Sequence, residues 1–450
     1  MRRSLTFKER YLRMTKRHKE KLLPHSLIAL GAFGAIIAGS EIWGAPADKP
    51  VSANQEDDEE RYQLSMLGDI MLGRHVMDTA PHHDGGYHAF FRNTKDKLAE
   101  ADYVTANFAQ PMLPINDPEF LDDTEGAGFI ENPEVLINNE DLLDGDEAFT
   151  SGEQFLEALT HEDATDAFTS EAIQRGGNII HDKDIQLFTE PASAEPLADI
   201  GFTNVSLANN HMLNFGNISA NYTLNTLEDN NIDTVGLGVG AEAAEPHVHT
   251  VGNNYEIATL SVTETYAAQT FAQAGILGVS AWYEGDAPGI IPAIQEASDK
   301  YDFTVVHFHW GTDFLSNPPD ETEERFAILA DAGADVIIGH NPSVLSPVEV
   351  IDETLVLTSM GNFISDQGWT RARDSAIADL HVTEADDGLE IDEVIFTPLR
   401  LSEFTPHGIE NPIEQMQQAR IFRQLSKNLD AEWETHDGRL HLDPEIEAES

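Results

Sequence analysis

The chain contains no cysteine, and its 450 residues include only 26 lysine and arginine residues against 80 aspartate and glutamate residues. The missing thiols exclude disulfides, thiolate metal sites and lipid attachment through cysteine. A formal net charge of −54 makes nucleic acid and anionic membrane surfaces unfavourable partners for most of the chain. No Gly-Lys pair occurs, which excludes a Walker A nucleotide-binding loop.

The few basic residues are concentrated at the start of the chain. Residues 1–21 hold nine of the 26 basic residues and two of the 80 acidic ones. Subtracting them leaves 17 basic and 78 acidic residues, a net charge of −61, for residues 22–450. Such a surface repels itself in dilute buffer, whereas at molar salt a Debye length of about 3 Å screens the repulsion. The composition therefore predicts a protein adapted to high salt.

An apolar run follows this basic segment. The uncharged stretch 27–39 is short for a spanning helix and closer to a signal-peptide core, but no sharp cleavage site comes after it. We expect residues 1–22 to stay in the cytoplasm and residues 23–45 to form a single membrane anchor, with a cleaved signal or a buried helix as alternatives. Residues 46–61 read as an acidic linker, so the main domain is expected outside the cell, at the membrane.

The organising stretch of the main domain is GFTNVSLANNHMLNFG, residues 201–216. Its apolar run, Val205 to Leu207, predicts a short buried strand. The strand breaks into Asn209, Asn210 and His211, and sites of open α/β sheets are built at such strand ends. Taken alone, these three residues are more typical of a loop that satisfies its own backbone than of a site.

Other predicted strands also end in polar residues. They reach Asp69, Asn107, His309, His340 and Asn362. His307 and His309 are two residues apart, so they face the same side of one strand, either as core histidines or as ligands. Helical patterns lie between several of the strands, which predicts a layered α/β architecture with one polar rim. Aspartate, asparagine and histidine at that rim suit a divalent metal such as Zn, Mn or Fe.

Five motifs in this order resemble a known family. They are GDIMLGR, ANNHMLNFG, HWGTDF, DAGADVIIGHNPSVLSPVEV and SMGNFISDQGWTRARDS. The chain resembles the CapA/PgsA family of capsule or poly-γ-glutamate synthesis proteins over residues 1–110 and 195–400. That family is similar to calcineurin-like metallophosphatases, which implies a two-layer β-sandwich flanked by helices with a dinuclear metal site on its rim.

The resemblance also implies roles for particular residues. Asp69 would bind a first metal, Asn210 and His309 a second with His340 beside them, and His211 would act as the general acid. The substrate-binding residues implied are Arg74, Asn209, Asn362, Arg371 and Arg373. The arginines could clamp a phosphate or a carboxylate, or simply pair with surface acids.

Several positions depart from the family pattern. Ala109 stands where a metal-bridging glutamate is expected, and Asn214 replaces an aspartate after the Asn-Asn-His triplet. Asn341 and Ser343 stand where histidines are expected. Each change removes a charge or an imidazole, so a mononuclear site of Asn210, His309 and His340, or no metal at all, remains open beside the dinuclear site.

The rest of the chain shows less specific patterns. The family-like domain is expected to span residues 62–382, with an acidic insertion at about 114–170 that lies outside the resemblance. Residues 383–450 read as a C-terminal extension of two strands and a helix. Gly236, Gly238 and Gly240 alternate but lack the helix and downstream acid of a dinucleotide fingerprint.

Three functions are compatible with these observations. The first is a membrane-anchored, weakly catalytic or non-catalytic subunit of a poly-γ-glutamate synthesis and export machine. Its partners would be other membrane subunits and the anionic polymer. The second is an extracytoplasmic metal-dependent phosphoesterase, and the third is a surface-layer or adhesion module.

Overall fold

The computed structural model describes residues 61–113, 185–252, 254–266, 270–272, 277–282, 289–368, 371–385, 388–409, 412–429 and 433–442. All of them belong to the second of two units into which the chain divides, Glu59–Ser450. The expected basic segment and anchor, nearly all of the linker and the acidic insertion at 114–170 lie outside the described residues. Within these ranges, no helix is long and apolar enough to cross a bilayer.

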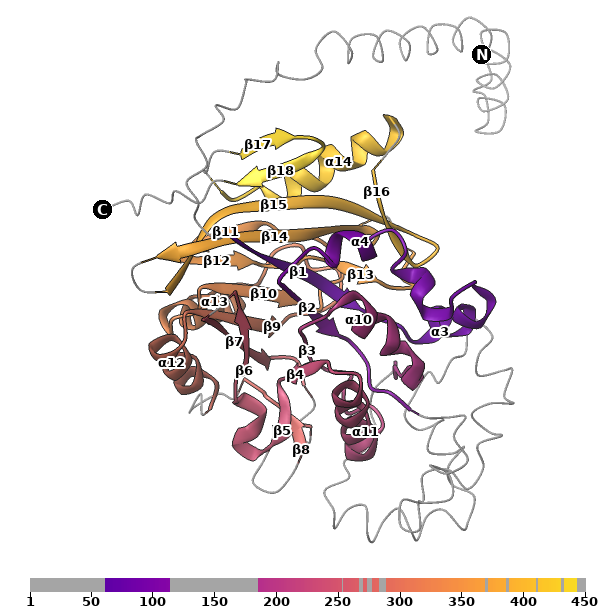
Figure 1. Ribbon diagram of the computed structural model, residues 1–450, viewed down its shortest axis with the longest axis horizontal. Coiled ribbons are helices and arrows are strands. Elements are labelled where there is room, and N and C mark those ends of the chain that lie inside the picture. The colour runs from indigo at the N-terminus through magenta and orange to yellow at the C-terminus, as the bar shows by residue number, and fades with distance from the viewer. Residues whose placement is uncertain are drawn as a thin grey trace, which may run out of the picture. The chain divides into compact units, whose positions relative to one another are not determined.

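The first sheet carries four parallel strands at one end and an antiparallel set at the other (Figure 1). Its order is β17-β18-β15-β14-β1-β2-β3-β4, with β13 also on β1 and β16 also on β15. The bounds are β1 Tyr62–Ile70, β2 Tyr103–Phe108, β3 Asn204–Ser206, β4 Asp233–Val235, β13 Asn362–Ile364, β14 Asp374–Ala385, β15 Gly388–Ser402, β16 Thr405–Gly408, β17 Trp433–His436 and β18 Arg439–Leu442.

The second sheet has the order β11-β12-β10-β9-β7-β6, and β5 and β8 form a separate pair. The bounds are β5 Leu237–Val239, β6 His247–Val251, β7 Tyr255–Thr263, β8 Leu277–Val279, β9 Phe303–His309, β10 Val336–His340, β11 Val348–Ile351 and β12 Thr354–Leu357. Strands β7, β9, β10 and β12 are parallel, so each sheet has one edge at which several carboxyl ends gather.

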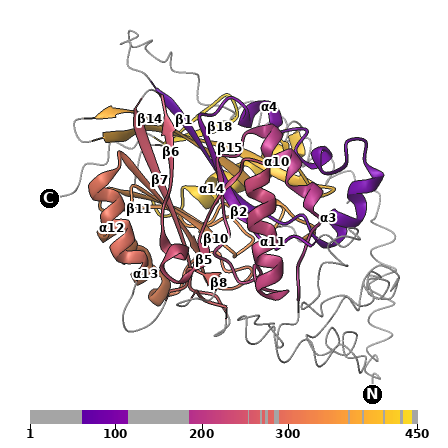
Figure 2. The ribbon, with the colours of Figure 1, turned by 60° about the horizontal axis from the view of Figure 1, so that its bottom comes forward.

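The described helices all lie between strands in the chain. Their bounds are α3 Arg74–Thr79, α4 Lys95–Leu98, α10 Glu195–Ile200, α11 Gly216–Asp229, α12 Ile290–Lys300, α13 Asp320–Asp331 and α14 Pro412–Leu425, with short 3-10 turns at Ala80–His82, Gly86–Phe90, Pro191–Ser193 and Gly240–Ala244. Figure 2 shows α12 and α13 beside the second sheet and α10 and α11 on the other side of the fold.

Three apolar clusters show how these elements are layered. One joins the first sheet to α3, α4, α10 and α11, and another joins the second sheet to α12 and α13. The cluster between them contains Leu64 of β1 and Val305 of β9, so it fills the space between the sheets and extends to Leu425 of α14. The predicted mixed α/β class is therefore confirmed, and the two sheets face one another with helices outside.

Side-chain alternation along β9 positions the two histidines. Val305 belongs to the cluster between the sheets, whereas Val306 and Phe308 belong to the cluster under α12 and α13. His307 and His309 therefore face the first sheet, as their spacing predicts.

Two expectations about chain segments need correction. The strand leading to Asn362 was expected to run continuously, but β12 ends at Leu357 and Asn362 begins a separate strand, β13, which pairs with β1 instead. The boundary at 382/383 falls inside β14, whose pairing with β15 continues through it.

Candidate functional site

The polar strand ends gather around one pocket, which we call the rim pocket. It lies where β1, β2, β3 and β9 end, and the loops after β10 and β13 close it. Its lining includes these residues of the expected site: Asp69, Arg74, Asn209, Asn210, His211, His309 and Asn362. His340 contacts Asp69 directly, whereas Arg371 and Arg373 line two other cavities.

Asp69 is held at the centre of this arrangement by the backbone beside it. A Cβ on Gly68 would lie 1.9 Å from the carbonyl oxygen of Gly361, so only glycine permits this approach. The close approach lets Asp69 N donate to Gly361 O at 2.9 Å. It aligns β1 with β13 and leaves the Asp69 carboxylate only 6% exposed.

Three donors engage the Asp69 carboxylate. Oδ1 accepts hydrogen bonds from Asn107 Nδ2 at 2.9 Å and His340 Nδ1 at 3.1 Å, and Oδ2 accepts one from Asn341 N at 3.1 Å. Burial alone would raise the pKa of Asp69. The hydrogen bond and charge of His340, the Asn107 amide and the charge of His309 outweigh burial, and the pKa is lowered below 3.8. Asp69 is therefore a buried carboxylate that accepts two hydrogen bonds at Oδ1 and one at Oδ2.

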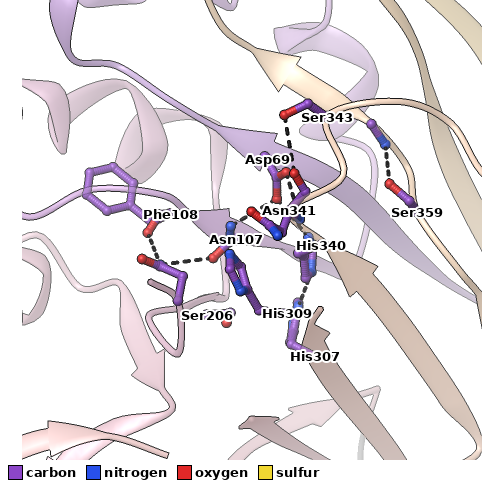
Figure 3. A network of polar contacts seen from close by, with 12 residues as sticks. Asp69, Asn107, Phe108, Ser206, His307, His309, His340, Asn341, Ser343 and Ser359 are labelled. Carbon is purple, nitrogen blue, oxygen red and sulfur yellow. Dashed lines mark hydrogen bonds and ion pairs between the residues drawn. The ribbon is translucent and has the colours of Figure 1, made fainter. Parts of the chain in front are cut away.

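Behind Asp69 a line of buried side chains crosses from one sheet to the other (Figure 3). The ring of His340 stacks on that of His307 with centroids 5.1 Å apart, and His340 Nε2 lies 2.8 Å from His307 Nδ1. His307 Nε2 lies 2.9 Å from Thr105 Oγ1 of β2. Both ring nitrogens of each histidine thus have protein partners.

The hydrogen-bond directions along this line fix the protons. Thr105 donates its hydroxyl proton to Asn204 Oδ1 at 2.7 Å, so it accepts from His307 Nε2. Burial, followed by repulsion from His340, holds the pKa of His307 well below 6.5, so His307 is neutral and its bare Nδ1 accepts from His340 Nε2. His340 Nε2 therefore faces the bare nitrogen of His307, and His340 Nδ1 faces the Asp69 carboxylate at 3.1 Å.

The Asn-Asn-His triplet is ordered by Asn209. Its side-chain oxygen accepts from the backbone N–H groups of His211 and Met212, both at 3.0 Å, and its Nδ2 donates to Phe108 O at 2.9 Å and Asn107 Oδ1 at 3.1 Å. Asn209 is only 2% exposed. Its hydrogen bonds thus hold the turn after β3 against the end of β2.

His211 reaches the rim pocket from that turn. The side-chain amide of Asn214 makes its hydrogen bonds in one orientation. In that orientation its oxygen accepts from Leu187 N at 2.7 Å and from His211 Nδ1 at 2.9 Å. Asn214 thereby orients the His211 ring as the expected aspartate would, but it supplies no charge to favour the imidazolium.

His309 and Asn362 also support the pocket wall. His309 is 3% exposed and its Nδ1 lies 3.0 Å from Thr263 Oγ1 on the neighbouring strand β7. Asn362 Nδ2 lies within 3.3 Å of Ser343 O, Gln367 Oε1 and Ala372 O. Asn362 therefore joins the loop after β10 to two residues of the connection between β13 and β14.

The residues present do not fit the dinuclear metal centre that the resemblance implies. Both ring nitrogens of His340 and both oxygens of Asp69 already have protein hydrogen-bond partners, which a metal would have to displace. Ala109 lines the pocket where a bridging carboxylate is expected. Across the described ranges, no group of three or more histidine, aspartate or glutamate side chains is placed to hold a metal ion.

Asn341 and Ser343, which stand in place of two expected histidines, hold the loop after β10. Both have left-handed backbones, with φ of 92° and 59°. Asn341 Nδ2 donates to Trp310 O at 2.9 Å and Gly311 O at 2.8 Å. This loop also positions the backbone N–H of Asn341, which donates to Asp69. The two residues that replace histidines therefore fix the conformation of the loop beside the pocket.

The rim pocket carries more negative than positive charge. Asp69, Asp313 and Asp366 line it, and Arg74 is the arginine among its lining residues. Arg74 Nε lies 3.3 Å from the buried carboxylate of Asp366, so this arginine is already paired. Arg74, which was expected to bind an anionic group of the substrate, therefore already forms an ion pair with an aspartate of the same pocket.

Sequence reasoning missed several residues of this site. His307 was recognised as facing the same way as His309, but not as the partner of His340. Asp366 and Gln367 follow β13 directly, and the same strand-end pattern that pointed to Asp69 would have found them. Thr105 lies inside a strand and gave no such signal.

The fold and this pocket define the chain as a mixed α/β protein with a polar site at its strand ends. It belongs to the family described as bacterial capsule synthesis protein PGA_cap, whose model matches residues 139–367, slightly more than half of the chain.

Curated relatives match along nearly the whole chain. The PGA biosynthesis protein CapA of Bacillus subtilis (strain 168) is 29% identical over 445 residues, covering 98% of this chain and 97% of the relative. The capsule biosynthesis protein CapA of Bacillus anthracis is 28% identical over 452 residues, covering 98% and 92%. The crystal structure of the calcineurin-like phosphoesterase YfkN from Bacillus subtilis aligns with 80% of this chain and 98% of its own, with a TM-score of 0.38 and 11% identity. A TM-score this low supports no conclusion, so the fold assignment rests on the strand pairing of this chain.

Proposed function

We propose that this protein is a membrane-anchored subunit of a poly-γ-glutamate capsule synthesis and export system, and that it contributes little or no catalysis of its own. The observation that carries the proposal is the near full-length similarity to proteins named for capsule and PGA biosynthesis. The basic start and the apolar run at 27–39 support an anchor with the main domain outside the cell. Other membrane subunits and the anionic polymer would be its partners.

The geometry of the rim pocket supports the weakly catalytic or non-catalytic part of the proposal. A two-metal phosphoesterase needs carboxylate oxygens and imidazole nitrogens that are open to the metals. In this chain, Asp69 and His340 bond each other, and the second ring nitrogen of His340 contacts His307. The pocket also carries three aspartates against one paired arginine, which disfavours an anionic phosphoester.

Deleting the gene in its host and restoring it with variants tests this function. We expect the deletion strain to lose cell-surface polymer, and the His211→Ala variant to restore it as well as the wild type does. His82→Ala, which alters an exposed histidine outside the pocket, is the matched control. Undiminished polymer in the deletion strain would overturn the role in synthesis. Loss of polymer with His211→Ala alone would overturn the non-catalytic role.

An extracytoplasmic metal-dependent phosphoesterase is the alternative, favoured by the orientation of His211 into the pocket by Asn214. Incubating the full-length protein in molar salt with bis-p-nitrophenyl phosphate and Mn, Zn or Fe tests it. Turnover above the protein-free rate that disappears in His211→Ala would establish this alternative. A rate equal to the protein-free rate with all three metals would remove it.

A further inference from the structure

Arginine is scarce in the main domain, yet four arginines gather around one aspartate, Asp374. Arg371 and Arg373 precede β14, Arg400 lies opposite Asp374 on β15, and Arg420 projects from α14. We call these four the arginine cluster. Counting Asp374, the group carries a net charge of +3, in a segment whose 17 basic residues face 78 acidic ones.

Asp374 cannot neutralise the whole cluster. Its carboxylate is 5% exposed; Oδ1 accepts from Arg400 Nη1 at 2.5 Å and Arg420 Nη2 at 2.6 Å, and Oδ2 accepts from Arg420 Nε at 2.8 Å. Two guanidinium groups therefore occupy both of its oxygens. The bidentate bond also fixes Arg420 between α14 and β14.

The other two arginines have no carboxylate partner in the part of the chain that the structure describes. Arg373 Nε donates to the backbone oxygen of Leu401 at 2.6 Å, which leaves its charge uncompensated. Arg371 is exposed and makes no ion pair with a described residue. With 78 acidic residues in the same segment, two arginines two positions apart that both lack a described carboxylate partner are unusual.

The charges within the cluster repel one another. Burial lowers the pKa of Arg400, the Asp374 carboxylate raises it, and the positive charges of Arg373 and Arg420 lower it again. A further anion at the cluster would relieve this repulsion.

A cavity opens onto one side of the cluster. Arg371, Arg420, Gln424 and Ser316 offer polar groups to it, and Val344, Leu345 and Ile421 form an apolar part of its wall. Lys427 adds positive charge nearby because its Nζ donates to Asn317, next to Ser316, at 3.1 Å. Asp374 is the acidic residue among the lining residues, and it is already paired twice.

Acids face the other side of the cluster. Arg373 lines a separate cavity together with Asp366 and Glu403, so its surroundings are mixed in charge. The cavity at Arg371 and Arg420 is therefore the positive one, whereas the rim pocket, with its three aspartates, is negative.

We propose that the cavity lined by Arg371 and Arg420 binds the carboxylates of an acidic polymer. This inference rests on the proposed function, because the anionic polymer named there is the ligand. Guanidinium groups match carboxylates in a planar, bidentate geometry, and the Gln424 amide can bond a peptide group beside them. The apolar wall suits the methylene groups that separate the carboxylates of a γ-linked glutamate chain.

Binding of a γ-linked glutamate oligomer to the purified full-length protein, measured by calorimetry in molar salt, tests this site. We expect Arg371→Gln to weaken binding about tenfold or more, since a charge-assisted contact is lost. Arg423→Gln, which removes an exposed arginine of α14 that lies outside the cavity, is the matched control and should change the affinity by less than about twofold. Arg371 pairs with no described carboxylate, so its replacement leaves folding intact, which thermal unfolding of the variant checks.

Three results would overturn the proposal. They are no binding by the wild type, equal affinities for Arg371→Gln and Arg423→Gln, and displacement of the oligomer by inorganic phosphate at concentrations where glutarate has no effect. The last result would identify a phosphate site. Loss of surface polymer in the deletion strain together with any of these results would leave the proposed function standing and remove this site alone.

Discussion

Replacing Asp69 by alanine should destabilise the protein strongly, whatever the protein does. The change leaves three buried donors without their acceptor, namely Asn107 Nδ2, His340 Nδ1 and Asn341 N. At about 1–3 kcal/mol for each orphaned group, the loss would be roughly 3–9 kcal/mol. The rim pocket adjoins Asp69, so water can reach part of the vacated space, and we expect a loss in the lower half of this range, about 3–6 kcal/mol.

A double-mutant cycle measures how much of this loss belongs to the contact between Asp69 and His340. Urea unfolding in molar salt gives the free energy of unfolding for Asp69→Ala, His340→Ala and the double variant. We expect a coupling energy of about 2–3 kcal/mol, toward the upper end for residues in one hydrogen-bonded network. Asp84→Ala, which removes an exposed aspartate, should change stability by less than about 0.5 kcal/mol.

Two outcomes would refute this reasoning. A coupling energy near zero would mean that Asp69 and His340 do not act as a pair. Stabilisation of the wild type, but not of Asp69→Ala, by added Mn, Zn or Fe would mean that the carboxylate is open to a metal, since a ligand stabilises only the state that binds it.

Three further predictions concern stability. Burial raises the pKa of Asp335 to about 6, so between about pH 4 and pH 6 this carboxyl binds more protons in the folded state than in the unfolded chain. The free energy of unfolding should therefore fall as pH rises from about 4 to 6. The same slope in the Asp335→Asn variant would contradict the assignment. Gly68→Ala, whose Cβ would meet Gly361 O at 1.9 Å, should cost at least about 3 kcal/mol in urea unfolding, whereas Gly408→Ala, which meets nothing within 4 Å, should be nearly neutral. Lowering the salt from about 2 M to about 0.1 M should lower the thermal midpoint because the chain carries a net charge of −54; an unchanged midpoint would argue against salt adaptation.

Local sequence patterns were sufficient for the fold class and for the pocket's main residues. Apolar runs that end in polar residues marked β1, β3, β9 and β10, and the two-residue spacing of His307 and His309 correctly predicted a shared face. These features depend on backbone periodicity, which neighbouring residues determine. The family resemblance rested on the same strand-end motifs, and the family model confirms it.

Only the tertiary structure decided how those residues are used. Asp69 and His340 are 271 positions apart in sequence, and whether they bind a metal or each other depends on how the two sheets bring β1 and β10 together. Strand order and register bring such residues within hydrogen-bonding distance, and both arise from long-range packing that no local pattern encodes. The same holds for Arg371, which the family resemblance implied as a substrate-binding residue beside the metal ligands but which the fold places at a separate cavity with Arg420 of α14.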